Sequence, residues 1–365
     1  MQDIAGLIIQ IVTGLFVLAS VLPLMKVPFG AVRGLAFPRV QIFWITLLLA
    51  VVAFFVIGAG PTVVVLLSIA ALQMVYVAKF TPIWRKQSLD ADRALVEDNR
   101  RHIRILTANV KLSNRAYDRL IDLTRSEAPD ILVAIETDDA WCDALIDELG
   151  EHYPHQLRVP RDTGYGICLL SRLELAEPQV RDLLIEGVPS IRTILTLRSG
   201  AQIRLYVVHP EPPVINHDTK GRDGEIAKVG MEAAEDRLPT IVTGDLNDVA
   251  WSTTTRRFQR LSGLADPRVG RGFYNTFSAF HWWARWPLDH LFHDPQFRLL
   301  EMKRLPKIGS DHFPVTFALA LGQSKARTEE TGEADEEETE EVREMIDEER
   351  KRDRKPIGDD WEDED

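Results

Sequence analysis

The chain has 365 residues, with 43 Lys and Arg against 55 Asp and Glu and a formal net charge of −12. This length holds one large domain with accessory segments. Two cysteines are too few for a disulfide framework, and the sequence has no zinc-type cluster of Cys and His, so a metal site would use mainly oxygen ligands. The stretch from Ser324 to Asp365 carries 20 acidic and 8 basic residues, which leaves 35 of each sign elsewhere. Composition therefore gives no support to a protein that neutralises many phosphates of duplex nucleic acid.

Two long segments near the N-terminus contain no charged residue, 4–25 and 40–78, and only Gly58-Ala59-Gly60-Pro61 interrupts the second. About 20 apolar residues cross the hydrocarbon core of a bilayer. A secretory signal fits less well because the segment has no positive leader, and buried helices of a soluble protein are rarely so long and uncharged. We expect three transmembrane helices near 4–24, 40–58 and 62–79.

Basic residues flank these expected helices on one side only. They are Lys26, Arg33 and Arg39 between the first and second helices, and Lys79, Arg85, Lys86 and Arg93 after the third. Because short loops rich in Lys and Arg remain in the cytoplasm, we expect an inner or cell membrane location with the rest of the chain cytoplasmic. The division we predict is 1–80 for the helices, 81–101 for a charged linker, 102–322 for a folded domain and 323–365 for a tail.

Short β-like runs recur through residues 102–322, and two segments, 115–126 and 138–149, are typical of helices. Many strands with few helices predict an α/β sandwich rather than a singly wound sheet. The tail is acidic and poor in aromatics, so we expect it to be disordered or loosely helical, with an unknown protein partner. The runs are 103–110, 131–135, 166–171, 193–197, 203–208, 240–243, 290–292, 297–302 and 315–319.

Polar residues of a few types stand at the ends of these runs. Strand ends at one edge of a sheet converge, so carboxylates, amides and imidazoles placed there can meet although they are distant in sequence. The sequence therefore predicts one site that joins these side chains. They are Asn109, Glu136, His209, Asp245, Asn247, Asp289, Asp311 and His312.

Several of these residues lie in motifs that resemble the signatures of the endonuclease/exonuclease/phosphatase superfamily, over about Ile103 to Leu321. The resemblance implies a four-layered α/β sandwich, in which helices flank two packed and mainly antiparallel sheets. The apolar segments predict an all-α transmembrane region before it. The resemblance also implies a metal-dependent phosphoesterase. The motifs are Gly244-Asp245-Leu246-Asn247, Asp289-His290, Gly309-Ser310-Asp311-His312-Phe313-Pro314-Val315, and, earlier in the chain, Asn109, Glu136 and Tyr165-Gly166-Ile167-Cys168-Leu169-Leu170-Ser171-Arg172.

The resemblance implies a role for each site residue, and each role suits metal-assisted attack of water on a phosphoester. Hard cations prefer oxygen ligands, so Mg²⁺ or Mn²⁺ would lie at Glu136, with Asn109 and Asp311 in or next to the same shell. Asp245 would orient or deprotonate the water, helped by Asn247. His312, held by Asp289, would hydrogen-bond the phosphate, and His209 would be a second phosphate contact or an acid.

The substrate stays open at this stage between a lipid head group, another phosphoester and a nucleic acid. Arg172 is a candidate phosphate contact, and Trp286 is a candidate substrate contact in the aromatic stretch 277–286, whose rings could equally pack in the core. Membrane attachment through the N-terminal helices favours a phosphoester at the membrane surface. The alternatives are an endonuclease or exonuclease of DNA or RNA, and a catalytically silent membrane scaffold that acts through the acidic tail.

Overall fold

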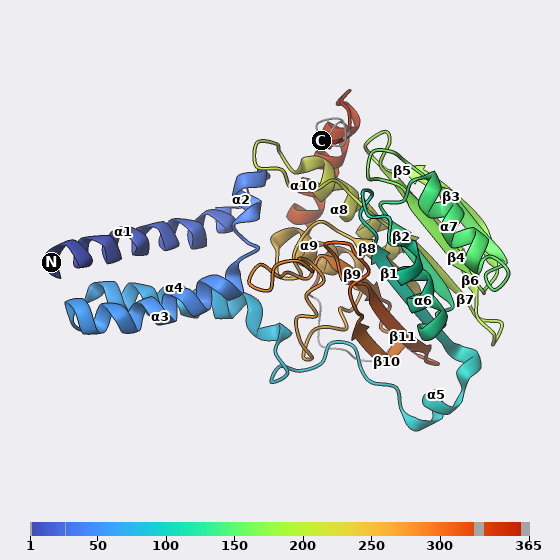
Figure 1. Cartoon of the computed structure of the whole chain (residues 1–365), viewed down its shortest axis with the longest axis horizontal. Helices are drawn as coiled ribbons and strands as arrows, with labels where there is room; N and C mark the ends of the chain where they lie inside the picture. The colour runs from blue at the N-terminus through green and yellow to red at the C-terminus, as the bar shows by residue number, and fades with distance from the viewer. Residues whose placement is uncertain (1, 26, 325–331, 359–365) are drawn as a thin grey trace.

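The computed structural model describes residues 2–25, 27–324 and 332–358. Figure 1 shows long helices that project from a globular part in which two β-sheets pack together. Helix α1 (Gln2–Val21) starts at the far tip of this projection and runs back to the globular part. The two parts correspond to the expected helical region and folded domain.

Three of the projecting helices are long and apolar enough to cross a membrane. Large apolar side chains on them, such as Phe55 and Val75, are exposed, whereas a small cluster around Ala53 and Leu66 packs the helices against one another. Such surface is removed from water only by an apolar surrounding. The apolar segments are Asp3–Met25, Arg39–Ile57 and Pro61–Phe80, and they contain α1, α3 (Arg39–Ile57) and α4 (Pro61–Val77).

Two sheets form the globular part, with strand orders β10-β11-β1-β2-β4-β3 and β5-β6-β7-β8-β9. Pairing is antiparallel except for β1 with β2 and β7 with β8. The first sheet contains β1 (His102–Asn109), β2 (Ile131–Ile135), β3 (His155–Val159), β4 (Ile167–Ser171), β10 (Phe297–Arg304) and β11 (Val315–Leu321). The second contains β5 (Leu175–Asp182), β6 (Pro189–Thr196), β7 (Gln202–Val207), β8 (Thr240–Asp245) and β9 (Asp289–His293).

The core lies between the sheets, where alternate side chains of both sheets interdigitate. Ile105, Val133 and Leu169 of the first sheet belong to the same buried cluster as Leu205 and Ile241 of the second. Alternation of this kind buries one face of each strand against the opposite sheet. The α/β sandwich that the sequence predicted is confirmed.

Helices cover the outer face of each sheet. The first sheet is covered by α6 (Tyr117–Glu127) and α7 (Asp139–Leu149), and the second by α8 (Lys220–Glu235) and α9 (Thr253–Ser262). Their ends follow ordinary capping chemistry: for example, the Asp138 side chain accepts a hydrogen bond of 2.8 Å from the Trp141 amide at the start of α7. The order helix, sheet, sheet, helix gives the four expected layers.

All nine predicted β-runs fall on strands, whereas β3, β5, α8 and α9 were not predicted. β3 and β5 are edge strands with mostly exposed or half-buried side chains, so they lack a clear apolar alternation. Helix α8 has no continuous apolar stripe, because it buries Arg222, Asp223 and Glu225 among its apolar residues. A pattern search that relies on hydrophobic periodicity misses such elements.

The segment 81–101, expected to be a linker, runs along the domain and packs on it. Leu299 in β10 donates its amide to the Leu89 carbonyl at 2.8 Å and accepts the Ala91 amide at 2.9 Å. Ser88 is buried, and its hydroxyl lies 2.7 Å from Nε2 of His293. The segment therefore ties the apolar helices to the edge of the first sheet.

Part of the tail, expected to be disordered or loosely helical, forms the docked helix α10 (Glu336–Arg350). Its buried Val342 and Ile346 pack against Ala227 of α8. The acidic residues pair with basic ones of the domain: Arg257 lies 2.6 Å from Glu341. Buried apolar residues one turn apart and ion pairs with the domain therefore hold this helix in place. Residues 325–331 and 359–365 lie outside the described chain.

Candidate functional site

The ends of β1 and β8 lie against each other across the sandwich. The hydroxyls of Thr107 and Thr243, one on each strand, are 3.0 Å apart. Two residues further along each strand, Asn109 Nδ2 donates a hydrogen bond of 3.1 Å to Asp245 Oδ2. The packing of the two sheets therefore places these predicted site residues in contact although 136 positions separate them in sequence.

Glu136 joins this contact because β2 runs parallel to β1. Asn109 is the register partner of Ile135, and its Nδ2 donates a hydrogen bond of 2.6 Å to Glu136 Oε1. Glu136 has a φ of 63°, a left-handed conformation that is uncommon for residues other than glycine. The tight turn directs its carboxylate to the strand edge, where the Leu112 amide also approaches it at 3.4 Å.

Gly244 allows the adjacent β7 to approach the end of β8. Its φ is 144°, and a Cβ atom at this position would lie 1.9 Å from the carbonyl oxygen of Val208. Any side chain would force these strand ends apart. The glycine before Asp245 is therefore a steric requirement of the site.

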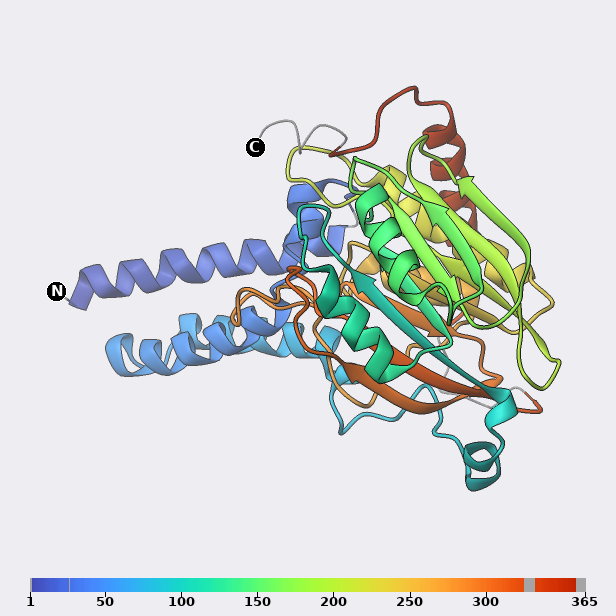
Figure 2. The same ribbon diagram turned by 45° about the vertical axis from the view of Figure 1, so that its right-hand side comes forward.

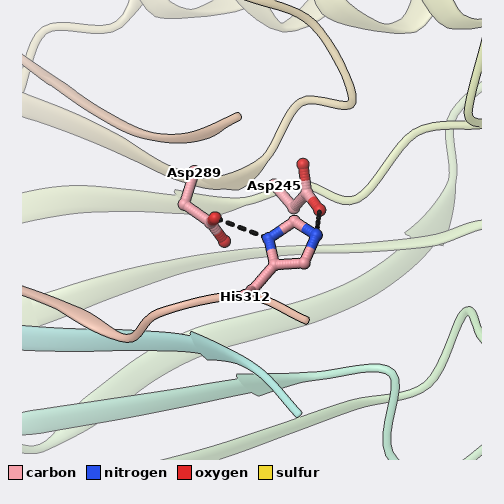
Figure 3. Close-up of side chains that lie close together, drawn as sticks. All are labelled: Asp245, Asp289 and His312. Atoms are coloured by element: carbon pink, nitrogen blue, oxygen red, sulfur yellow. Dashed lines mark hydrogen bonds and ion pairs between the residues drawn. The ribbon is translucent and has the colours of Figure 1, made fainter. Parts of the chain in front are cut away.

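His312 lies between two carboxylates. Asp289 is the register partner of Asp245 on the neighbouring strand, and Figure 3 shows the imidazole directed at both side chains. His312 Nδ1 lies 2.8 Å from Asp289 Oδ2, and its Nε2 lies 3.6 Å from Asp245 Oδ2. Asp289 thus fixes the ring with Nδ1 as donor and leaves Nε2 directed toward Asp245.

These charges change the protonation of the site. Burial alone would lower the pKa of His312, but the carboxylates of Asp289 and Asp245 raise it to about 10. Burial raises the pKa of Asp245, and the His312 charge opposes this shift. At neutral pH the imidazole is therefore a cation, which suits an anionic ligand.

His209 and Asn247 complete the polar side of the site. His209 Nε2 lies 4.0 Å from Glu136 Oε1, and burial lowers the pKa of His209 to about 4, so its ring is neutral at pH 7. Its Nδ1 is buried without a hydrogen-bond partner among the described residues. The Asn247 amide nitrogen donates to the Pro210 carbonyl at 2.9 Å, and its backbone N–H donates to Asp245 Oδ1 at 2.8 Å.

A cavity of about 380 Å³ opens over these side chains. Its polar residues include Glu136, His209, Asn247, Asp311 and His312. Its remaining walls are mostly apolar and come from five separate parts of the chain. They include Phe37, Tyr165, Pro212, Pro213, Phe277, Leu288 and Ile357.

The oxygen donors at this cavity fit a divalent cation. Burial raises the pKa of Glu136 to about 7, which shows how poorly its negative charge is compensated by the protein. Asp311 lines the same cavity, and Lys111 Nζ lies 3.5 Å from its Oδ2. Asp245, Asp289 and His312 also offer ligand atoms within 4.8 Å of one another. Asp289 and His312 are already hydrogen-bonded to each other, and a hard cation prefers carboxylate oxygens such as those of Glu136 and Asp311 to an imidazole nitrogen.

Arg172 lies away from this site. It follows Ser171, whose register partner Ile131 begins β2, whereas Glu136 follows the other end of that strand. Its guanidinium lies 4.8 Å from the Tyr153 ring centroid. The structure thus corrects the expectation that Arg172 contacts the same ligand. The motif that contains Arg172 forms β4, which runs antiparallel to β2 and ends at the opposite end of the strands from Glu136.

Trp286 does not line the cavity but packs against a residue that does, Phe277. It stacks on Phe277 with ring centroids 6.0 Å apart, and the Phe277 ring lies 5.0 Å from that of His312. Trp286 also contacts Phe37, at a centroid distance of 5.8 Å. It therefore supports the apolar wall rather than lining the cavity.

Sequence reasoning missed several wall residues, among them Tyr165, Phe37 and Ile357. Tyr165 opens one of the quoted motifs, and burial raises its pKa, so its hydroxyl stays protonated and donates to the Ile357 carbonyl. Arg354 holds the same tail segment through Glu211 at 2.7 and 2.8 Å. Phe37 and Ile357 lie outside the predicted domain, and no pattern in the sequence marks them.

Comparison with known proteins identifies the fold. The model of the Endonuclease/Exonuclease/phosphatase family matches residues 106–312. No significant match was found among curated protein sequences.

Solved structures with similar folds have low sequence identity to the chain. An endonuclease/exonuclease/phosphatase family protein from Bacteroides thetaiotaomicron is 16% identical, with a TM-score of 0.50 over 62% of this chain and 98% of that one. D. rerio TDP2 complexed with a single-strand DNA product is 17% identical, with a TM-score of 0.50 over 60% and 98%. A protein of the same family from Bacteroides vulgatus is 18% identical, with a TM-score of 0.50 over 60% and 99%.

Asp289→Asn should lower the pKa of His312. The substitution removes the negative charge that accepts from Nδ1, and a hydrogen-bonded opposite charge shifts a pKa by roughly 1–3 units. A pH titration of ¹⁵N-labelled histidine by NMR measures the change, with the resonance assigned by its loss in His312→Gln. The control is Asp130→Asn, which neutralises a buried carboxylate at the other end of β1 and β2 and should leave the His312 titration unchanged. An unshifted pKa in Asp289→Asn would show that this carboxylate does not hold the imidazolium.

Proposed function

Because the chain belongs to the endonuclease/exonuclease/phosphatase family, whose members are hydrolases, we propose that it is a membrane-anchored, metal-dependent phosphoesterase. The observation that carries this proposal is the placement of His312 between Asp289 and Asp245, in one cavity with Glu136. An imidazolium, an oriented carboxylate and a set of oxygen donors are what hydrolysis of a phosphoester requires.

The residues divide the chemistry between them. Asp245 orients the attacking water and accepts its proton, while Nε2 of His312 donates to an oxygen of the phosphate. Asp289 keeps His312 in the required tautomer, and neutral His209 provides a second contact for the phosphate. Asn109 donates to both Glu136 and Asp245 and so holds the two carboxylates in place.

A divalent cation completes this arrangement in the proposed mechanism. Glu136 and Asp311 would hold Mg²⁺ or Mn²⁺, with Asn109 next to them, because such ions prefer carboxylate oxygens. When bound, the ion would neutralise charge on the phosphate oxygens. The bound ion would also compensate the Glu136 charge, which burial otherwise disfavours.

The three apolar helices would anchor the protein in the membrane, with the catalytic domain in the cytoplasm. Their length and composition support spanning, and the basic residues flanking them, such as Arg33 and Arg85, favour the cytoplasmic side. Two spans separate the two basic flanks, so both flanks and the domain that follows the third span lie on the same side.

Asp245→Asn should abolish most phosphoesterase activity. The amide keeps the shape of the carboxylate but cannot accept the proton, and loss of general base catalysis costs roughly 10²–10⁴-fold in rate. Turnover of bis(p-nitrophenyl) phosphate and of p-nitrophenyl phosphate with Mg²⁺ measures this and separates diester from monoester chemistry. Arg172→Ala is the control and should keep wild-type turnover, since Arg172 lies at the opposite end of β4. Full activity in Asp245→Asn would refute the assigned role.

Glu136→Gln should weaken binding of Mn²⁺. An uncharged amide is a poorer ligand for a hard cation, so we expect a loss of about ten-fold or more in affinity, comparable to the loss seen when a partner of a metal ligand is removed. Electron paramagnetic resonance of free Mn²⁺ measures binding without reference to activity. The matched control is Glu225→Gln, which replaces a buried glutamate on α8 that lies outside the cavity lining. Equal affinity in both variants would place the ion elsewhere.

Alkaline phosphatase fused after Leu321 should be inactive in a bacterial host. The reporter needs disulfides that form outside the cytoplasm, so inactivity reports a cytoplasmic domain. Fusion after Gly60, in the turn between the second and third spans, is the control and should be active. An active enzyme at Leu321 would reverse the proposed orientation.

A further inference from the structure

A hairpin-like loop beside the cavity exposes three large aromatic side chains. The loop is closed at its base, where the Phe277 amide donates to the Trp286 carbonyl at 3.0 Å and the Ser278 amide donates to the Ala284 carbonyl at 3.0 Å. Its tip carries Phe280, Trp282 and Trp283, whose exposed fractions are 53%, 81% and 63%. The stacking of Phe277 on Trp286 makes the base rigid, so the rings at the tip are held away from the core. We call residues 277–286 the aromatic loop.

The aromatic loop lies at the base of the apolar helices. Gln41, near the start of α3, donates its side-chain amide to the Trp283 carbonyl at 3.0 Å. Figures 1 and 2 both show the orange loop extending toward these helices. Trp44, one turn further along α3, is also exposed. Tryptophan side chains favour the boundary between lipid and water, and this boundary is expected where a membrane span begins.

Positive charges surround the aromatic loop. Lys111 Nζ lies 5.8 Å from the Phe280 ring centroid, and the same amine forms an ion pair with Asp311. Three more cations cluster on the Phe313 ring, with Arg304 at 4.4 Å from its centroid. The other two are Arg285 and Lys307. Basic groups beside exposed aromatics match the chemistry of an anionic lipid surface.

One wall of the cavity lies next to the start of an apolar span. Its wall residue Phe37 precedes Arg39, the first residue of the second apolar span, by two positions. Two residues extend at most about 7 Å. The polar layer of one leaflet is roughly 5–8 Å thick, from the difference between total and hydrocarbon thickness. A phosphate in this layer therefore lies within reach of the cavity.

The cavity has the polarity that an amphiphile requires. His312, Glu136 and Asp311 are grouped on its polar side, whereas Phe37 and Leu288 belong to its apolar walls. Its volume of about 380 Å³ suits a head group and the first carbons of a chain. The wall that contains Phe37 is the one closest to the apolar helices.

We propose that the aromatic loop inserts into the membrane surface and that the substrate is a membrane lipid with a phosphoester head group, which enters the cavity from the same bilayer. This inference rests on the proposed phosphoesterase function. In the reaction, the oxygen of water bonds to phosphorus, the ester P–O bond breaks, and the leaving oxygen takes up the proton released by the water. The lipid is divided into an alcohol and a phosphorylated product, without any other reactant.

The test uses the full chain reconstituted with Mg²⁺ in vesicles of phosphatidylcholine, phosphatidylglycerol, sphingomyelin and phosphatidylinositol phosphates. Mass spectrometry identifies lipid products, and bis(p-nitrophenyl) phosphate measures soluble turnover in the same vesicles. We expect a lipid to be hydrolysed when it shares the vesicle with the protein. The same lipid should remain intact when supplied in separate vesicles.

The double variant Trp282→Ser/Trp283→Ser should reduce the rate of lipid hydrolysis at least about ten-fold. A factor of ten equals only ~1.4 kcal/mol, and two indole rings inserted into the membrane surface contribute more than this. The double variant should keep soluble turnover, since neither side chain lines the cavity. Val180→Ser, an exposed apolar residue on edge strand β5, is the matched control and should keep both activities.

The outcomes separate the inference from the function on which it rests. Soluble turnover with no lipid product, or cleavage of single-stranded DNA in place of lipid, overturns the lipid substrate but leaves the phosphoesterase. Equal lipid hydrolysis by wild type and the double variant overturns the role of the aromatic loop. If the wild-type protein hydrolyses neither a lipid nor the soluble diester, both the inference and the proposed function are overturned.

Discussion

The face-to-face packing of the two sheets is the constraint on which the site depends. It aligns the carboxyl ends of β1 and β8 so closely that Thr107 and Thr243 touch and that Asn109 bonds to Asp245 two residues later. A core of aliphatic side chains sets this alignment, and burial of apolar area is the largest favourable contribution to folding. The position of the polar groups is thus determined by side chains that take no part in the chemistry.

The same packing makes the charges of the site interdependent. His312 is a cation because two buried carboxylates face it, and Asp289 and Asp245 tolerate burial because the cation lies between them. A second buried ion pair supports the site: Arg222 pairs with Asp223 and donates to the Asn247 carbonyl at 2.9 Å. Asp223 also pairs with Arg33 at 3.1 Å, which connects the short helix before the second span to the loop that follows Asp245.

Segments from both ends of the chain enclose the cavity. Phe37 comes from the connection between the first two apolar spans, and Ile357 from the tail that α10 docks onto the domain. The catalytic fold shared with other family members accounts for the polar side of the cavity, whereas these additions shape its entrance. Specificity for a substrate is therefore expected to depend on the segments outside the shared fold, because they decide what can approach the polar side of the cavity.

The sequence alone determined the apolar spans, the strands with clear alternation and the polar residues at their ends. These features are local: a run of apolar residues or a carboxylate after a buried strand is visible without knowing its neighbours. The sequence could not determine that Arg172 lies at the opposite end of the sheet, because this depends on the direction of strand pairing. It also could not determine that Trp286 supports the cavity wall or that the acidic tail docks on the domain, because both depend on contacts between distant segments. Tertiary structure decided which polar residues meet, since only the packing of β1 against β8 converts their spacing along the chain into distances of a few ångströms.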